Sequence, residues 1–412
     1  MPDTLSGVLK SPAIAMRICQ VIPFFYPSTQ FGGTVTQTKL LCDELAHRGH
    51  DVHVVTTDLG QEDRGLSDRW VNLNGYRVWY SSCAPYARIA PYFNRRLAAP
   101  LAELASEIDI AHLQTGLTYI NSVAVRELSK RKIPLVYTPN GCLDPRRLHI
   151  KRLAKMAFLK WVERPVIAHV NRLSAVCEPE LDHFARQGCP AEKMVRIPNG
   201  VKPPDLTDVS RQRAAFRQRW GIPADAFTIL FLGQLVWFKG IPKLMEQVAR
   251  LVPEFSQLQL VLAGPDAGMQ TKAQALVQKH QLQNHVTFTG HLHEEQKWEA
   301  FAAADCFSLL SESEGLPLTI LEAAAAGVPS IVTRECNAGD IERYDAGWTT
   351  SQFADDIHAA FREAIRNPEL LAQKSENALQ MTREATSIAA VADQFLDTYE
   401  ALIHESQHTA AV

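Results

Sequence analysis

Two glutamates, Glu314 and Glu322, stand eight positions apart in the segment from Ser311 to Pro329. The apolar run Cys306–Leu310 predicts a buried parallel strand before them, and the Gly-Leu-Pro sequence after the first glutamate predicts a turn whose proline takes the first position of a helix. Glu322 would lie about two turns inside that helix, and a rise of roughly 1.5 Å per residue puts up to ~12 Å between the carboxylates. They cannot act as acid and base on one atom, but they can hold two ends of one ligand.

The chemistry of these carboxylates suits a sugar nucleotide. A carboxylate such as Glu322 can accept hydrogen bonds from both hydroxyls of a ribose diol, while Glu314 and the free amides after it can meet sugar hydroxyls or developing charge. The plain alternative is a carboxylate at a helix N-terminus with an ordinary solvated glutamate behind it. If the first interpretation holds, the turn and helix start also contact the ligand, through Gly315, Leu316, Pro317 and Leu318.

Length and composition are those of a folded protein with two domains of ordinary size. The chain has 412 residues, 46% hydrophobic and 21% charged, so each half can bury a core of its own. The N-terminal region lacks the order of a secretory signal, and no run approaches the ~20 apolar residues of a membrane-spanning helix. We expect the protein to stay in the cytoplasm. The eight cysteines form no Cys-x-x-Cys pair, which favours reduced thiols over a structural zinc site.

Charge is distributed unevenly along the chain. Residues 1–200 hold 25 Lys and Arg against 18 Asp and Glu, whereas the remainder holds 17 against 27. The basic first half suggests an anionic partner. Its densest basic tract, Arg146–Trp161, is either a solvated amphipathic helix or a surface for anionic lipid or a lipid-diphosphate acceptor at the inner face of the membrane. In the second interpretation the contacting residues are Arg146, Arg147, Lys151, Arg152 and Lys155.

Strands alternate with helices along nearly the whole chain, which is typical of parallel sheets covered on both faces. In the first half we predict strands at 16–22, 51–56, 76–80, 109–113, 134–138 and 172–177, and in the second at 227–232, 258–263, 286–289, 306–310 and 330–333. Each half is therefore predicted to be a doubly wound sheet. Ligands bind beyond the carboxyl ends of the strands in such sheets, so two facing sheets would hold one substrate between them.

Three prolines and a glycine interrupt all periodicity at 197–205 and predict a hinge there. We therefore divide the chain into a first, acceptor-side domain at 1–200 and a second, donor-side domain at 201–386. Residues 387–412 read as a long amphipathic helix followed by a mobile tail.

The pattern Glu-Gly-Leu-Pro-Leu-x3-Glu-Ala-x3-Gly-x-Pro, from Glu314 to Pro329, resembles the retaining glycosyltransferases of family 4. The resemblance spans residues 16–404 and is most specific at 311–329. It implies an α/β, GT-B fold: two facing Rossmann-like, doubly wound domains with a cleft between them and a C-terminal helix that crosses back onto the first. It also implies that Glu314 orients the donor sugar and stabilises charge, and that Glu322 holds the ribose.

A second element, Gly233 to Gly240, resembles the family's Gly-Arg-Leu-x3-Lys-Gly sequence. A glycine that ends a strand lets backbone approach a phosphate, and Lys239 can reach the same diphosphate. The alternative for Lys239 is an ordinary surface lysine. The departure is Gln234, where the family usually has a phosphate-binding arginine, and loss of that bidentate cation weakens the predicted diphosphate grip unless another basic group compensates.

Further strand ends in both halves match loops of the family. The pair Gly32-Gly33 stands where the loop after the first strand passes the donor phosphates. Asn140 stands where the family has His or Arg aimed at the donor sugar; an amide can hydrogen-bond a hydroxyl but carries no charge, and a plain Asn-Gly turn is the alternative. Gly264 and Gly290 end two strands of the second half and match loops that line the nucleotide.

The sequence thus predicts a retaining, metal-independent hexosyltransferase with Glu314, Asn140 and Lys239 at the reacting centre. Its donor would be a UDP- or GDP-sugar, its acceptor a hydroxyl of a glycan or lipid-linked glycan in cell-surface polysaccharide synthesis, and no nucleic acid would bind. No metal cofactor is expected, since no Asp-x-Asp element is present. Two alternatives stay open: a GT-B scaffold protein that binds nucleotide with little turnover, which Gln234 and Asn140 make credible, or another GT-B enzyme such as a sugar-nucleotide epimerase. A glycan phosphorylase does not fit the length of the chain, and no sequence context for a pyridoxal lysine is found.

Overall fold

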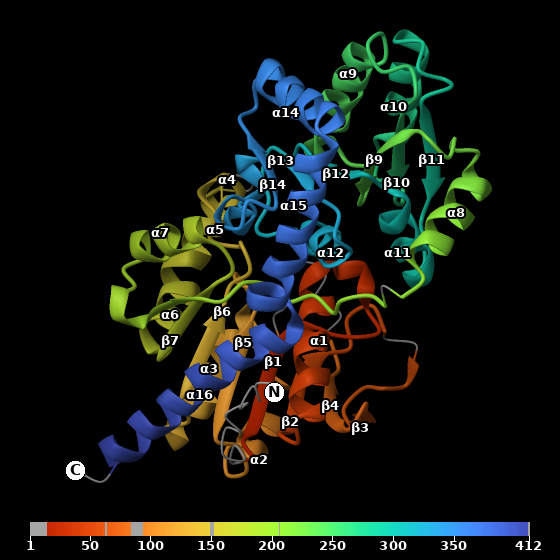
Figure 1. The fold of residues 1–412 in the computed structure, drawn as a ribbon. Coiled ribbons are helices and arrows are strands. Elements are labelled where there is room, and N and C mark those ends of the chain that lie inside the picture. The colour runs from red at the N-terminus through yellow and green to blue at the C-terminus, as the bar shows by residue number, and fades with distance from the viewer. Residues whose placement is uncertain (1–14, 62–63, 84–93, 149–151, 206, 411–412) are drawn as a thin grey trace, which may run out of the picture.

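The computed structural model describes residues 15–61, 64–83, 94–148, 152–205 and 207–410, and it contains two separate sheets (Figure 1). Lys151 of the basic tract falls outside these residues. The first sheet has the strand order β3-β4-β2-β1-β5-β6-β7-β8, and the second has β11-β10-β9-β12-β13-β14. Counted from its own first strand, the second sheet has the order 3-2-1-4-5-6 of a dinucleotide-binding Rossmann fold.

The first sheet is parallel except for β3, which pairs antiparallel with β4 at one edge. Its strands are β1 (Arg17–Phe24), β2 (Asp51–Thr57), β3 (Trp70–Leu73), β4 (Tyr76–Ser81), β5 (Ile110–Gln114), β6 (Leu135–Thr138), β7 (Arg172–Ala175) and β8 (Met194–Arg196). Its helices are α1 (Gly33–His47), α2 (Ala98–Leu104), α3 (Tyr119–Leu128), α4 (Pro145–Leu148), α5 (Arg152–Phe158), α6 (Arg164–His169) and α7 (Glu178–Arg186).

The second sheet is wholly parallel. Its strands are β9 (Phe227–Leu232), β10 (Leu258–Ala263), β11 (Val286–Gly290), β12 (Cys306–Leu309), β13 (Ser330–Thr333) and β14 (Gly347–Thr350). Its helices are α8 (Val209–Trp220), α9 (Ile241–Leu251), α10 (Gln270–Lys279), α11 (Glu294–Ala303), α12 (Leu318–Ala325), α13 (Gly339–Arg343), α14 (Ala354–Arg366) and α15 (Pro368–Met381).

All eleven strands predicted from sequence are present. The sequence analysis missed β3, β8 and β14, and each of these lies at the edge of its sheet. Edge strands are short and partly exposed, so they lack the continuous apolar run that marks a central parallel strand.

The last helix, α16 (Ile388–Ala410), lies against the first domain, where it contacts α1 (Figure 1). Its apolar face, which includes Val391, Phe395 and Tyr399, belongs to the same buried cluster as Ile18 and Leu41 of the first sheet and α1. The helix continues to Ala410, so the tail expected after it is helical over most of its length.

The two chain segments that pass between the sheets are joined by backbone hydrogen bonds. Val201 N donates to Thr386 O at 2.8 Å, and Ile388 N donates to Val201 O at 2.7 Å. Gly200 allows this approach, because a Cβ there would lie 2.8 Å from the Ile388 side chain. We propose domain limits of 1–200, 201–386 and 387–412, with these paired segments as the hinge.

The described part of the basic tract predicted as a helix at Arg146–Trp161 is helical. It comprises α4, α5 and a π-helical turn, Leu159–Glu163, that leads into α6. Glu163, the last residue of this turn, is buried, and its carboxylate accepts hydrogen bonds from Leu117 N and Tyr137 Oη. Burial raises the pKa of Glu163 to about 7.

Candidate active site

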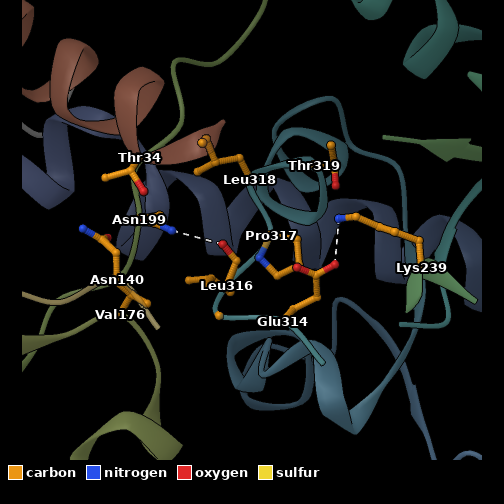
Figure 2. Close-up of a pocket in the computed structure, with 12 residues that line it drawn as sticks. Thr34, Asn140, Val176, Asn199, Lys239, Glu314, Leu316, Pro317, Leu318 and Thr319 are labelled. Atoms are coloured by element: carbon orange, nitrogen blue, oxygen red, sulfur yellow. Dashed lines mark hydrogen bonds and ion pairs between the residues drawn. The ribbon is translucent and has the colours of Figure 1, made fainter. Parts of the chain in front are cut away.

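A cavity of about 310 Å³ lies between the two domains, at the carboxyl ends of their strands. Figure 2 shows Thr34, Asn140 and Asn199 on one side of it and Lys239 with Glu314 on the other. Eight residues predicted for the site line the cavity: Gly33, Asn140, Lys239, Glu314, Gly315, Leu316, Pro317 and Leu318. Four more that the sequence analysis missed do so too: Thr34, Val176, Asn199 and Thr319.

Lys239 and Glu314 form an ion pair on the second-domain side. The Lys239 ammonium lies 2.7 Å from Glu314 Oε1, and Ser311 Oγ donates to the same oxygen at 2.9 Å. The backbone of Glu314 is also fixed, since its N donates to Glu335 O and its O accepts from Asn337 Nδ2 at 2.8 Å. The carboxylate therefore has a defined position at the mouth of the second sheet.

Helix α12 presents its N-terminus to the cavity. Pro317 is its N-cap rather than its first residue, and the helix begins at Leu318. Glu322 is accordingly just over one turn inside the helix, not two. Asn199 Nδ2, from the segment between the domains, donates to Leu316 O at 3.1 Å and so ties this turn to the first domain. The amides at the start of α12 form an environment suited to anionic groups.

Glu322 lies outside the residues that line the cavity, and its carboxylate is paired with Lys297 of α11 at 2.9 Å. Both side chains are about one-seventh exposed. Burial raises the pKa of Glu322, and Lys297 acts in the opposite direction. Sequence reasoning missed Lys297, because a lysine on a helix otherwise rich in charge carries no distinguishing signal.

Three predicted glycines of the second domain, Gly233, Gly264 and Gly290, lie outside the cavity lining, as do Gly32 and Gln234. Gly233, Gly264 and Gly290 instead support one another: Gly264 N donates to Gly290 O, and a Cβ on Gly264 would lie 1.9 Å from Gly233 O. Their first role is close packing of adjacent strand ends. Gln234 is exposed.

The first-domain side of the site is formed by Gly33, Thr34 and Asn140. A Cβ on Gly33 would lie 3.3 Å from Leu318, so this glycine permits the close approach of α1 and α12. Asn140 has a left-handed backbone (φ 55°), and the buried carboxylate of Glu180 accepts from Gly141 N and from Val176 N. Glu180 thus fixes the turn that carries Asn140, a role the sequence did not reveal.

The comparisons with known proteins agree with this geometry. Residues 31–203 match the model described as Glycosyltransferase Family 4, and residues 212–381 match the model described as Glycosyl transferases group 1. The chain belongs to glycosyltransferase family 4. The resemblance inferred from the sequence and the predicted GT-B fold are both confirmed.

Named relatives of this glycosyltransferase cover most of its length. It is 27% identical over 331 residues to alpha-monoglucosyldiacylglycerol synthase of Streptococcus pneumoniae, an alignment that covers 77% of this chain and 70% of the relative. It is 22% identical over 388 residues to N-acetyl-alpha-D-glucosaminyl L-malate synthase of Bacillus anthracis, covering 93% and 97%. Anabaena HepE, solved in complex with UDP, superposes with a TM-score of 0.74 at 18% identity, covering 94% of this chain and all of HepE.

The basic tract of this glycosyltransferase divides into two parts. Arg146 lies at the domain interface, where it pairs with Asp144 of the first domain at 2.8 Å and its Nη1 donates to Glu312 O of the second domain at 3.3 Å. Arg147 and Arg152 lie in α4 and α5. On α5 and the turn after it, three apolar side chains are exposed beside Lys155 and Lys160: Leu153 (88%), Met156 (48%) and Trp161 (73%).

Two negative findings apply to the described part of this glycosyltransferase. Among those residues, no three His, Cys, Asp or Glu side chains are grouped so that they could hold a metal ion. Within the same ranges, no helix combines the length and the apolar character needed to cross a membrane.

Proposed function

We propose that this glycosyltransferase moves a hexose from a UDP-sugar to a hydroxyl of a glycan or glycolipid, with retention of anomeric configuration. The observation that carries the proposal is the cavity between the domains, where Lys239 and Glu314 face Asn140 across the cleft. UDP is favoured over GDP because HepE has been solved with UDP and with UDP-glucose. The names of the S. pneumoniae and B. anthracis relatives support a hydroxyl acceptor on a lipid or a small molecule.

The proposed roles follow from charge and position. Lys239 supplies the cation for the leaving diphosphate, and the amides at the start of α12 supply further donors. Glu314 orients the donor sugar and stabilises positive charge as the glycosidic bond breaks. Lys297 pairs with Oε1 of Glu322. The other carboxylate oxygen of Glu322 accepts hydrogen bonds from the ribose hydroxyls. Lys239 acts in place of a divalent metal in this scheme.

We also propose that the enzyme works at the inner surface of an anionic membrane, in the synthesis of a cell-surface glycan or glycolipid. The support is the surface of Leu153, Met156 and Trp161 beside Lys155 and Lys160. Exposed apolar side chains flanked by lysines are typical of helices that lie in the headgroup region. Because α5 belongs to the first domain, membrane and acceptor would be on the same side of the cleft.

A panel of nucleotides and nucleotide sugars tests the proposal. We expect UDP to raise the melting temperature, because a ligand that binds only the folded state stabilises it in proportion to ln(1 + [L]/Kd). Transfer from a UDP-sugar to diacylglycerol in anionic vesicles, or to a soluble glycan, should then be detectable in excess chelator. Stabilisation by UDP without transfer or hydrolysis of any donor would favour the scaffold alternative. Stabilisation by GDP alone would overturn the assignment of the base.

A further inference from the structure

A ring of buried hydrogen bonds connects the cleft to α16. It begins at Thr138 O, which accepts from Asn140 Nδ2 at 3.1 Å, and the same nitrogen lies 3.2 Å from Gln114 Oε1. Gln114 Nε2 donates to Gln20 Oε1 at 3.2 Å, and Gln20 Nε2 donates to Tyr399 Oη at 3.4 Å. His112 closes the ring: its Nδ1 lies 2.7 Å from Tyr399 Oη, and its Nε2 lies 2.7 Å from Thr138 Oγ1.

The directions of the bonds made by the three side-chain amides in this ring are fixed by its starting point. A backbone carbonyl can only accept, so Asn140 must turn its NH2 group toward Thr138 O. Gln114 must then present oxygen to Asn140 and nitrogen to Gln20, and Gln20 must present nitrogen to Tyr399. Tyr399 Oη accepts from Gln20 Nε2 and still carries its own proton, which we assign to the bond with His112 Nδ1.

This assignment places the proton of His112 on Nε2, which donates it to Thr138 Oγ1. Gln114 Nε2 also lies 3.2 Å from His112 Nε2 and 3.4 Å from its Nδ1. The imidazole of His112 is fully buried, and burial lowers the pKa of His112 to about 3, so a second proton is not acquired near neutral pH. Gln20, His112 and Tyr399 are wholly inaccessible to solvent, so water does not offer alternative partners.

The consequence for the cleft is a fixed orientation of the Asn140 amide. Its nitrogen is used twice inside the first domain, and Figure 2 shows that nitrogen turned away from Glu314. No hydrogen bond among the described residues engages Asn140 Oδ1, and Asn140 lines the cavity. The group it offers to a ligand is thus an acceptor.

We propose that Gln114, Gln20 and Tyr399 are positioning residues that hold Asn140 Oδ1 toward the cleft, where it accepts a hydrogen bond from a hydroxyl of the sugar that is transferred. The inference rests on the proposed function. It assigns the C-terminal helix a second role besides packing, because Tyr399 of α16 accepts the hydrogen bond that keeps Gln20 Oε1 turned toward Gln114. It also accounts for the absence of a cationic side chain at position 140, since Asn140 meets a hydroxyl and not a phosphate.

Gln114→Met tests the proposal in the activity of the full chain. Methionine keeps the volume but removes the oxygen that, together with Thr138 O, holds the Asn140 NH2 group. We expect turnover of UDP-glucose to fall about tenfold, the equivalent of one misplaced hydrogen bond, while the Kd for UDP stays within about twofold. Unchanged turnover, or equal losses of turnover and UDP affinity, would overturn the proposal.

Tyr399→Phe and Tyr76→Phe form a matched pair. Both tyrosines are buried in the same cluster, and each hydroxyl makes a hydrogen bond, but that of Tyr76 goes to Asp43 and lies outside the ring. Both variants should lose stability to a similar extent. Only Tyr399→Phe should lower turnover, and an equal loss in Tyr76→Phe would show that stability alone is responsible.

A spectroscopic readout separates this proposal from the proposed function. In protein labelled with 15N-histidine, His112 should stay neutral from about pH 5 to about pH 9. Titration of His112 in this range would place a charge inside the ring and overturn the inference even if the enzyme is active. If no donor is turned over, the proposed function fails, whereas this measurement still tests the ring.

Discussion

The Lys239 ammonium lies 2.7 Å from Glu314 Oε1 at the floor of the cleft. The residue proposed to meet the diphosphate is therefore in contact with the residue proposed to meet the sugar. A diphosphate that approaches Lys239 competes with Glu314 for the ammonium, so binding of the nucleotide and placement of the carboxylate are coupled.

Glu314→Gln should separate the two roles. The amide keeps the shape and an oxygen for Lys239 but loses the negative charge, so turnover should fall about 10²- to 10³-fold, the scale expected for loss of one charge-stabilising group. The Kd for UDP should stay equal or decrease, because a neutral amide competes less for the ammonium. Calorimetry with UDP and a transfer assay measure the two quantities.

Lys239→Met is the reciprocal control. Loss of the cation should raise the Kd for UDP about 10- to 150-fold, corresponding to roughly 1.5–3 kcal/mol for a hydrogen bond to a charged group. If Glu314→Gln instead weakens UDP binding as much as it slows turnover, Glu314 is a nucleotide ligand and its assignment to the sugar is wrong.

Glu322 and Lys297 predict a pH dependence of nucleotide binding. Burial raises the pKa of Glu322, and Lys297 opposes that effect. In Lys297→Met the pKa of Glu322 should rise further, so the carboxylate becomes protonated at a higher pH. Because the ribose hydroxyls need an anionic acceptor, the variant should lose UDP affinity relative to the unmodified protein as pH falls from about 8 to about 5.

The quantity to measure at each pH is the Kd of Lys297→Met for UDP divided by the Kd of the unmodified protein for UDP. Titration of UDP itself affects both proteins equally and so leaves this ratio unchanged. Lys297→Arg retains a cation and should show a nearly constant ratio. A constant ratio in Lys297→Met as well would remove Glu322 from the ribose site.

The fold could be predicted from the sequence because the central strands of both sheets are parallel and have continuous apolar runs. The core of the cleft could also be predicted: Lys239, Glu314 and Asn140 each follow a strand, and strand ends meet at one edge of a Rossmann sheet. Partners brought in from distant segments could not be found this way. Lys297, Glu180 and Tyr399 contact the site residues only after the chain has folded, and none stands in a distinctive local pattern.

Gln234→Arg tests whether diphosphate binding is weakened by the glutamine at position 234, where the family usually has an arginine. Gln234 is exposed, so an arginine can be accommodated without repacking. We expect the added guanidinium to tighten UDP binding, because its planar fork matches phosphate oxygens. Thermal-shift titration with UDP measures the change, and Gln234→Lys serves as a control for charge alone. Unchanged affinity would mean that position 234 does not reach the phosphates.

The surface of α5 gives a prediction about membrane binding. Replacing Leu153 and Trp161 by serine should release the protein from anionic vesicles, because each buried apolar side chain contributes about 1.5–3 kcal/mol. Replacing Lys155 and Lys160 by glutamine should weaken binding by about 1 kcal/mol per residue and reduce its dependence on salt. Vesicle sedimentation measures both effects.

Phe353 provides the control for exposed apolar area, since it is 76% exposed but stands in the second domain before α14. Phe353→Ser should leave vesicle binding intact. If the unmodified protein fails to sediment with anionic vesicles at low salt, the exposed residues of α5 serve another purpose and the membrane proposal is lost.

The anomeric configuration of the transferred sugar tests the central claim most directly. The unmodified protein is incubated with an α-linked UDP-sugar, a hydroxyl acceptor and excess chelator, and the proton coupling at the new anomeric centre is read by NMR. We predict an α-linked product that forms about 10²- to 10³-fold more slowly with Glu314→Gln. A β-linked product, or the failure of every nucleotide sugar to yield product under these conditions, would contradict a retaining, metal-independent glycosyltransferase.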